Sequence, residues 1–302
     1  FTKAFKNLEL SICFSQKNDE TASLSKYVAA SNHYLESWCD YEFKSGEYSL
    51  AQPVIKTLFN TKQFQDLLLV WAGSKSSYHD FIKANWKKNI LEKESWNKSL
   101  HDGVFIKKSK NISKGNFISQ NRISSKNLKY FQIIQDSNPN KLELNLYPKT
   151  GMGDGQQANN PWLQEFPDPL TRATWDNYLT ISESDAKNLN LLLDPSTFFK
   201  QSSNDANGGL NGKYAIIKLN EKTIKVPVMI QPGQAKGTVG LSYGYGRSKG
   251  LKEEMMTGVN AFHFYENFNP YQLIEIEATN DIHEFACMQL QNTLMGRGDI
   301  IK

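Results

Sequence analysis

The sequence predicts a two-part protein, an α/β region followed by a β-rich domain. Two patterns support this prediction. Apolar residues recur at helical spacing early in the chain, as in 64–71, whereas from about Lys129 they alternate with polar residues at the period of a strand. The chain has 302 residues, of which 39% are hydrophobic, so it can bury one large core or two modest ones.

Residues 1–73 are interpreted as the end of the α/β region. The run NLELSICFS (7–15) is typical of a strand, and NDETASLSKYV (18–28) is typical of a short helix with an N-cap at its first Asn or Asp. A longer helix is predicted over 61–73, because four apolar residues fall at i, i+3, i+4 and i+7 and a glycine follows them.

The next part of the chain is predicted to be helical and basic. Residues 78–100 carry apolar side chains on one helical face, and the loop to about Leu128 is interpreted as a linker or insertion. Twelve Lys or Arg and three acidic residues lie from Lys83 to Lys129, although the whole chain has a net charge of only +4. A solvated face is the favoured interpretation of this stretch. The alternatives are a docking surface for an acidic partner and one for anionic lipid headgroups.

From Lys129 the patterning favours strands bounded by turns. Ser182 and Asp185 have the spacing of a helix cap, which predicts one short helix, SDAKNLN, after the strand end YLTIS. A barrel with a helix across its mouth fits this order, and a sandwich remains open. The predicted strand runs are KYFQIIQ, KLELNLYP, YAIIKL, TIKVPVMI, TVGLSYG and QLIEIEA.

The order of these pieces resembles the last domain of the molybdopterin oxidoreductases. The resemblance rests on NNPWLQEFPDPLTRATWDNYLTISESDAKNLNL (159–191) and on YAIIKLNEKTIKVPVMIQPGQAKGTVGLSYGYGR (214–247). That family carries a strand, a DA-x-x-L helix, a strand pair and a Pro-Gly turn that leads to a GYG-like loop. The positions that match these features are Asp185, Ala186, Leu189, Pro232, Gly233 and Gly244–Gly246.

The resemblance implies three regions. Residues 1–128 are expected to be the C-terminal part of a molybdopterin-oxidoreductase-type α/β domain with a helical, basic insertion. Residues 129–250 are expected to form a double-psi β-barrel of the molybdopterin dinucleotide-binding type. Residues 251–302 are expected to be a C-terminal extension that leads toward an iron-sulfur region absent from this chain. Because the first residue is Phe rather than Met, we expect an excised fragment.

Within this family the chain is most similar to the B subunit of bacterial alternative complex III, a respiratory quinol oxidoreductase. The likeness rests on HYLESWCDYE, SLAQPVIKTLF, NNPWLQEFPDP and CMQLQNTLMGR. It implies a structural, non-catalytic part of an electron-transfer subunit whose iron-sulfur clusters lie in the missing downstream region. The implied partners are integral membrane quinol-binding and haem c subunits on the periplasmic side of the cytoplasmic membrane.

Neither nucleic acid nor a direct membrane span is expected. The mean hydropathy is −0.55 and no apolar run reaches membrane-spanning length, so we predict that the chain is soluble and reaches the bilayer only through partners. The alternative hypothesis is a fragment of a genuine molybdenum or tungsten oxidoreductase that binds the pterin dinucleotide.

Two glycine-rich segments supply the candidate cofactor-binding residues. In SYGYGR, glycines could bring backbone N–H groups close to a phosphate while an arginine supplies charge; a tight turn at a barrel rim is the alternative. The dinucleotide fingerprint G-x-G-x-x-G fails here, because position 249 is Lys. The candidates, whose role we expect to be weak or vestigial, are Asn159, Asn160, Tyr243, Gly244, Tyr245, Gly246 and Arg247.

The segment GMGDGQQANNPW (151–162) falls where the family meets the pterin. Cofactor-binding relatives offer Ser, Thr or His side chains there, whereas this chain has Met152, Gly153 and Asp154. A buried carboxylate at Asp154 would repel phosphates, with Arg247 as the only nearby counter-charge. We therefore expect no cofactor in this chain, and molybdopterin dinucleotide only under the alternative hypothesis.

No catalytic residue and no metal site is predicted. The three cysteines lack C-x-x-C spacing, and no Ser-His-Asp arrangement or carboxylate pair can be assembled from the spacing. His283 and Cys287 are four apart and would share a face on a helix, but two ligands do not make a site. A buried Cys beside a hydrogen-bonded His is favoured.

Overall fold

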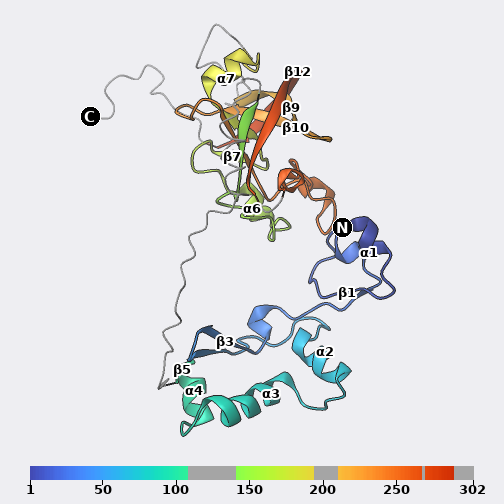
Figure 1. The fold of residues 1–302 in the computed structure, drawn as a ribbon, viewed down its shortest axis with the longest axis vertical. Coiled ribbons are helices and arrows are strands. Elements are labelled where there is room, and N and C mark those ends of the chain that lie inside the picture. The colour runs from blue at the N-terminus through green and yellow to red at the C-terminus, as the bar shows by residue number, and fades with distance from the viewer. Residues whose placement is uncertain (108–140, 194–209, 267–268, 289–302) are drawn as a thin grey trace, which may run out of the picture. The chain divides into compact units, whose positions relative to one another are not determined.

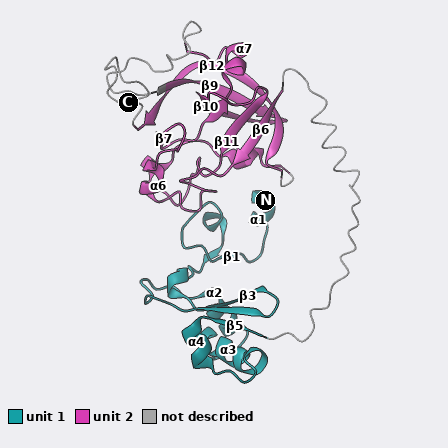
Figure 2. Cartoon of the chain, turned by 90° about the vertical axis from the view of Figure 1, so that its left-hand side faces the viewer, with its two compact units in different colours: residues 1–122 teal, residues 123–302 magenta. Residues whose placement is uncertain are grey.

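The computed structural model describes residues 1–107, 141–193, 210–266 and 269–288 (Figure 1). The chain divides into two compact units, residues 1–122 and 123–302 (Figure 2). Each unit has its own buried core. The predicted strand run KYFQIIQ lies outside the described residues.

Unit 1 combines short helices with a small antiparallel sheet. Strands β3, β4 and β5 pair in that order, and β1 pairs with β2 in parallel over two residues. The elements are α1 (Thr2–Lys6), β1 (Ile12–Cys13), η1 (Ala22–Leu24), β2 (Tyr27–Val28), η2 (Tyr34–Glu36), β3 (Cys39–Lys44), β4 (Glu47–Ala51), α2 (Phe64–Trp71), α3 (Tyr78–Asn85), the π-helical turn η3 (Trp86–Ile90), α4 (Trp96–Asp102) and β5 (Val104–Ile106).

The core of unit 1 is built around Trp86. This side chain is fully buried and meets Trp96 edge to face. Its Nε1 donates to Asp40 Oδ2 at 2.9 Å, and the hydroxyl of Tyr78 donates to Asp40 Oδ1 at 3.3 Å. Burial, and then the Asp40 charge, raise the pKa of Tyr78 to about 12. Asp40 therefore fixes two aromatic side chains of the helical layer to strand β3.

The sequence prediction for unit 1 is confirmed in part. Helix α2 and the positive φ of Gly73 agree with it. The predicted helix over 78–100 is interrupted, because its first part ends after Ile90 and a new N-cap at Ser95 starts α4. The predicted helix at 18–28 is only the 3-10 turn η1. The main sheet is antiparallel rather than the parallel sheet of an α/β region, because a tight turn at Gly46, with φ +81°, joins β3 directly to β4.

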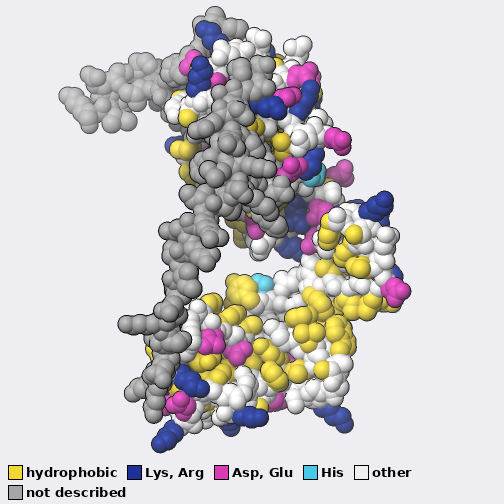
Figure 3. Space-filling model, in the orientation of Figure 1, with side chains coloured by type: hydrophobic (Ala, Val, Ile, Leu, Met, Phe, Trp, Pro, Cys, Tyr) yellow, Lys and Arg dark blue, Asp and Glu magenta, His cyan; other side chains and the backbone are white. Residues whose placement is uncertain are grey.

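Hydrophobic side chains are unusually exposed in unit 1. Figure 3 shows them over much of the visible face around α2. Isolated exposed apolar side chains are normal, but a large number together is typical of an interaction surface. The residues 41–78% exposed between the sheet and the end of α2 are Val54, Ile55, Leu58, Phe59, Leu68, Val70 and Trp71.

Unit 2 contains a closed barrel. Strands β6, β11, β8, β10, β9 and β12 pair in that order and β12 returns to β6, while β7 pairs with the far end of β12. The pairs β6–β11 and β8–β10 are parallel and the others antiparallel. The elements are β6 (Leu142–Tyr147), α6 (Pro161–Glu165), β7 (Ala173–Thr174), β8 (Leu179–Ile181), α7 (Glu183–Asn188), β9 (Leu210–Leu219), β10 (Lys222–Ile230), β11 (Thr238–Ser242), η4 (Glu253–Met255), η5 (Ala261–Phe264) and β12 (Tyr271–Cys287).

The barrel interior explains the period-two pattern. Alternate residues of each strand point inward, as Leu144 and Leu146 of β6 do, while Glu143 and Asn145 face outward. The barrel prediction is confirmed, and residues 214–243 contain no helix. Strand β12 lies after Gly250, where the sequence placed the start of an extension, and it closes the barrel by pairing with both β6 and β9.

Helix α7 begins at the predicted cap. Ser182 Oγ accepts from Asp185 N at 3.1 Å and donates to Asp185 Oδ2 at 2.7 Å. The same carboxylate oxygen accepts from Gly237 N at 2.7 Å, so the cap also holds the turn before β11. Both capping side chains are buried.

We expect Ser182→Ala to lower the free energy of unfolding by about 1 kcal/mol, because the cap bond is lost and Asp185 loses a donor. Urea unfolding monitored by far-UV circular dichroism measures this change. Among the described contacts, the exposed neighbour Ser184 makes no hydrogen bond to the backbone and meets the cap only through the Ser182 hydroxyl, at 3.1 Å, so Ser184→Ala should stay within about 0.5 kcal/mol of wild type. Equal losses in the two variants would contradict the capping role.

No helix within the described residues is long and apolar enough to cross a membrane.

Candidate functional site

The two glycine-rich segments predicted to meet a cofactor lie directly against each other. A Cβ on Gly155 would fall 2.8 Å from Gly244 Cα, and a Cβ on Gly244 would fall 2.5 Å from Met152 Cγ. Arg247 Nη1 donates to Gly155 O at 2.9 Å. The glycines therefore allow the loop 151–160 to pack on the loop 243–247, and the arginine ties the two loops together.

A third segment holds the GYG loop from its other side. Gly246 has φ +71°, and a Cβ there would fall 2.1 Å from the backbone nitrogen of Asn260. Gly246 N donates to Thr257 O at 2.9 Å. The side chain of Tyr245 is only 4% exposed. The close approach that the sequence suggested for a ligand is thus made by the protein's own backbone at 257–260.

Asn177 organises this region, although the sequence analysis did not identify it. The residue is fully buried in the loop before β8. Its Nδ2 donates to Ser242 O at 2.8 Å and to Val259 O at 2.9 Å, while its Oδ1 accepts from Val259 N at 2.8 Å. A single Asn in a loop gives no sequence signal for such a role, because its three backbone partners lie 65 and 82 positions away.

The two remaining candidates, Asn159 and Asn160, lie at the end of the loop 151–160 and do not face a common point. Asn160 Oδ1 accepts from Trp162 N at 3.1 Å and so caps α6, while Asn159 is exposed. The expectation of a buried carboxylate at Asp154 is wrong. Asp154 is exposed, and its two oxygens accept from N and Nε2 of Gln156 at 3.1 and 3.0 Å. The local turn at Gly153 and Gly155 carries the Asp154 side chain away from the protein, so solvent screens its charge.

The residues present do not fit a phosphate-bearing cofactor well. A phosphate site at a glycine loop needs backbone N–H groups that point at the ligand. Here these groups already donate within the chain: Gly153 N to Lys149 O, Gly155 N to Met152 O, and Gly246 N to Thr257 O, at 2.7, 3.1 and 2.9 Å. Arg247 is likewise bound to a backbone carbonyl. These three glycine N–H groups and the arginine therefore serve the fold itself.

Lys149 is a buried cation at the base of the loop 151–160, and the sequence analysis missed it as well. It is 3% exposed, and its Nζ donates to Asp176 O at 2.7 Å and to Tyr245 OH at 3.2 Å. The ammonium also lies over the rings of Tyr178 and Tyr245, at 5.4 and 5.0 Å from the centroids. Burial lowers the pKa of Lys149 to about 8, and the charges of Asp168 and Asp176 partly oppose this shift.

His283 belongs to a hydrogen-bonded chain rather than to a helical metal pair. Its Nε2 lies 2.8 Å from Asp176 Oδ2, and its Nδ1 lies 2.8 Å from the hydroxyl of Tyr214. His283 and Cys287 are on strand β12, not on a helix, and four residues of strand separate their backbones by about 13 Å. Across the described part of the chain, no group of three or more His, Cys, Asp or Glu side chains is arranged to hold a metal ion.

No protein-family model and no curated protein matches this sequence. Among solved structures, acetylene hydratase from Pelobacter acetylenicus aligns with a TM-score of 0.52 and 15% sequence identity. The alignment covers 84% of this chain and 37% of that one, so this chain spans less than two fifths of the enzyme's length. At this identity the likeness concerns the fold alone. The closed mixed barrel, its accompanying sheets and its helices thus have a fold similar to part of that structure.

Proposed function

We propose that this chain is a structural, non-catalytic part of an electron-transfer protein, built on a molybdopterin-oxidoreductase-like fold. The observation that carries the proposal is the mutual packing of the two candidate cofactor loops. Gly155 and Gly244 meet at a distance that excludes a methyl group, and Arg247 is used to join the loops. The glycines and the arginine of these two loops hold the backbone of the chain itself. The loops are therefore better suited to a structural role than to binding a dinucleotide.

The finer assignment is to a respiratory quinol-oxidising subunit of the alternative complex III type. The sequence resemblance supports it, as does the exposed hydrophobic surface of unit 1, which is typical of a part that docks onto other subunits (Figure 3). In this proposal the partners are quinol-binding membrane subunits and haem c subunits on the periplasmic side. The iron-sulfur clusters belong to another region of the same subunit.

The barrel is proposed to be of the double-psi type. Its two parallel pairs, β6–β11 and β8–β10, are separated by the antiparallel pair β11–β8, which is compatible with two interlocked copies of one motif. The barrel places the loops 151–160 and 243–247 side by side after the adjacent strands β6 and β11. This arrangement also supports the second candidate function, a genuine molybdopterin enzyme whose last domain contacts the pterin dinucleotide.

Metal and pterin analysis of the full-length protein, purified with its neighbouring subunits, separates these two functions. We expect iron without molybdenum or tungsten, and no extractable pterin. Stoichiometric molybdenum or tungsten with pterin would contradict the structural assignment.

Calorimetric titration of this chain with a guanine dinucleotide provides a second measurement. We expect no saturable binding, because the N–H groups of Gly153, Gly155 and Gly246 already have acceptors within the chain. Tight binding that weakens on Arg247→Ala would favour the enzyme, because the arginine would then serve a ligand as well as Gly155. An exposed basic residue outside the loops, Lys236, offers the matched control Lys236→Ala.

A further inference from the structure

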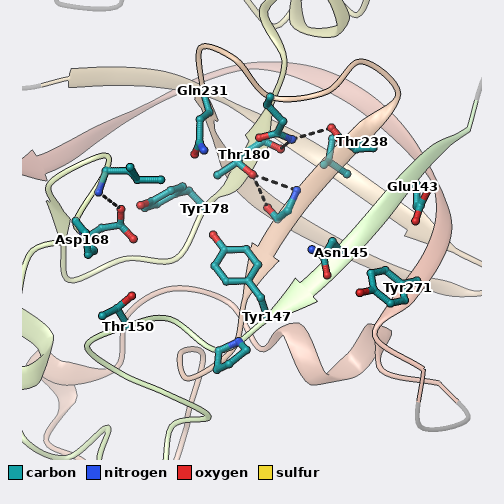
Figure 4. Close-up of a pocket in the computed structure, with 16 residues that line it drawn as sticks. Glu143, Asn145, Tyr147, Thr150, Asp168, Tyr178, Thr180, Gln231, Thr238 and Tyr271 are labelled. Atoms are coloured by element: carbon teal, nitrogen blue, oxygen red, sulfur yellow. Dashed lines mark hydrogen bonds between the residues drawn. The ribbon is translucent and has the colours of Figure 1, made fainter.

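A cavity of about 580 Å³ lies on the outside of the barrel (Figure 4). Its floor is the outward face of β6, β11 and β8, and its walls come from the segments 148–150, 168–170 and 231–234. None of its lining residues belongs to the loops 151–160 and 243–247. The polar and aromatic side chains that give it its character include Glu143, Asn145, Tyr147, Asp168, Gln231 and Tyr271.

Gly240 makes the floor of this cavity flat. A Cβ at this position of β11 would fall 2.7 Å from Thr180 Oγ1 and 3.1 Å from Tyr147 Cε1. Because the side chain is absent, Thr180 Oγ1 can accept from Gly240 N at 3.1 Å and the ring of Tyr147 can cross the strand. The floor therefore offers an aromatic surface between two neighbouring strands.

Part of the polar lining is already used by the fold. Asp168 Oδ1 accepts from Leu170 N at 2.9 Å, and Gln234 Nε2 donates to the carbonyls of Thr180 and Thr238 at 3.1 and 2.7 Å. The side chains of Asn145, Tyr147 and Gln231 make no hydrogen bond among the described residues, and Figure 4 shows them around the cavity. Both donors and acceptors are thus available to a ligand.

The charge of the lining is negative. Glu143 and Asp168 lie at opposite sides of the cavity in Figure 4, and the described lining contains no Lys, Arg or His. Burial, and then the Asp168 charge, raise the pKa of Tyr147 to about 12, so its phenol stays neutral. The buried cation Lys149 does not line the cavity and is held by Asp176 O and Tyr245 OH. An anionic ligand would be repelled, whereas a cation would meet carboxylates and aromatic faces.

We propose that this cavity binds a linear aliphatic polyamine, with one ammonium group at Glu143, another at Asp168, and the methylene chain lying across Tyr147. Glu143 and Asp168 lie at opposite sides of the cavity, so the ligand must span it, which suits an extended triamine better than a short diamine. The free amide groups of Asn145 and Gln231 accept from the ammonium hydrogens between the ends. This site is independent of the proposed electron-transfer role.

The net charge of the chain makes the proposal testable. The net charge of the chain is +4, so the protein as a whole repels a polycation. Saturable binding of a polycation must therefore come from a local site. Calorimetric titration of the 302-residue chain with spermidine, near physiological salt, should give one site per chain. Putrescine should bind at least several-fold more weakly, and glycerol and inorganic phosphate should not bind.

Two isosteric variants test the residues. We expect Glu143→Gln and Asp168→Asn each to weaken spermidine binding about tenfold, because each removes one ammonium–carboxylate pair. Asp168→Asn keeps the oxygen that accepts from Leu170 N, so the loop should stay folded. Glu221→Gln, at an exposed turn between β9 and β10, is the matched control and should leave affinity unchanged. Absence of saturable binding overturns the proposal, as does binding weakened equally by all three variants, which would indicate general surface attraction.

Discussion

Replacing Gly246 by alanine should destabilise unit 2 by about 2–5 kcal/mol. Two effects add at this position. A non-glycine residue at φ +71° costs about 1–2 kcal/mol, and a methyl group placed 2.1 Å from the backbone nitrogen of Asn260 must displace backbone, for which overpacking costs of about 1–3 kcal/mol are typical. Thermal and urea unfolding, followed by circular dichroism, measure the loss.

Gly233 provides a matched control for the backbone term. It has φ +82° in the turn after β10, but nothing lies within 4 Å of the position that its Cβ would take. Gly233→Ala should therefore cost only about 1–2 kcal/mol. The difference between the two variants isolates the clash with the 257–260 segment. Equal costs would show that Gly246 is needed for its dihedral angle alone, and would leave room beside it for a ligand.

This comparison also bears on function. If Gly246→Ala unfolds unit 2 at moderate temperature while Gly233→Ala does not, the GYG loop is a packing element held between Met152 on one side and Asn260 on the other. Packing of this kind is the basis for the proposed structural role. Gly246 N would have to leave Thr257 O before it could meet a phosphate.

The sequence predicted the barrel well because its signal is local. Strands β10 and β11 have one face in a closed apolar interior, so alternation along each strand reports which residues face that interior. Helix α7 was predictable for the same reason, since Ser182 and Asp185 sit three positions apart and satisfy each other. The closure of the barrel by β12 was not predictable, because the register of β12 with β6 depends on contacts more than 120 positions apart.

The candidate site was harder to predict because its chemistry is set by distant partners. Glycines at 155, 244 and 246 lie where other atoms approach closely, but a sequence cannot say whether the approaching atoms belong to a ligand or to the chain. Lys149 gave no signal at all. A lysine between Pro148 and Thr150 is typical of a solvated turn, and only the enclosing rings of Tyr178 and Tyr245 bury it.

Lys149 should make the stability of unit 2 rise with pH in the weakly alkaline range. The pKa of the folded state, about 8, lies below the ordinary value of 10.5. Below pH 8 both states are protonated, and the buried charge is a constant penalty. Between the two pKa values the unfolded chain holds a proton that the folded chain has released, so the free energy of unfolding increases with pH. From about pH 7 to about pH 9.5 the increase should be about 2 kcal/mol.

Comparison with Lys149→Met isolates this effect, because methionine fills similar space without a titrating group. The variant should lack the rise. The free energy of unfolding of wild type minus that of the variant should therefore increase by about 2 kcal/mol across that range. Buried tyrosines such as Tyr147, with a pKa raised to about 12, lower stability only above about pH 10 and are common to both proteins. Lys141→Met, at an exposed lysine beside β6, should follow the wild-type curve. If Lys149→Met also follows the wild-type curve, the ammonium of Lys149 is solvated in solution. The segment that encloses this ammonium then opens far enough to admit water. Such opening would also free the loop 151–160 from its packing against Gly244.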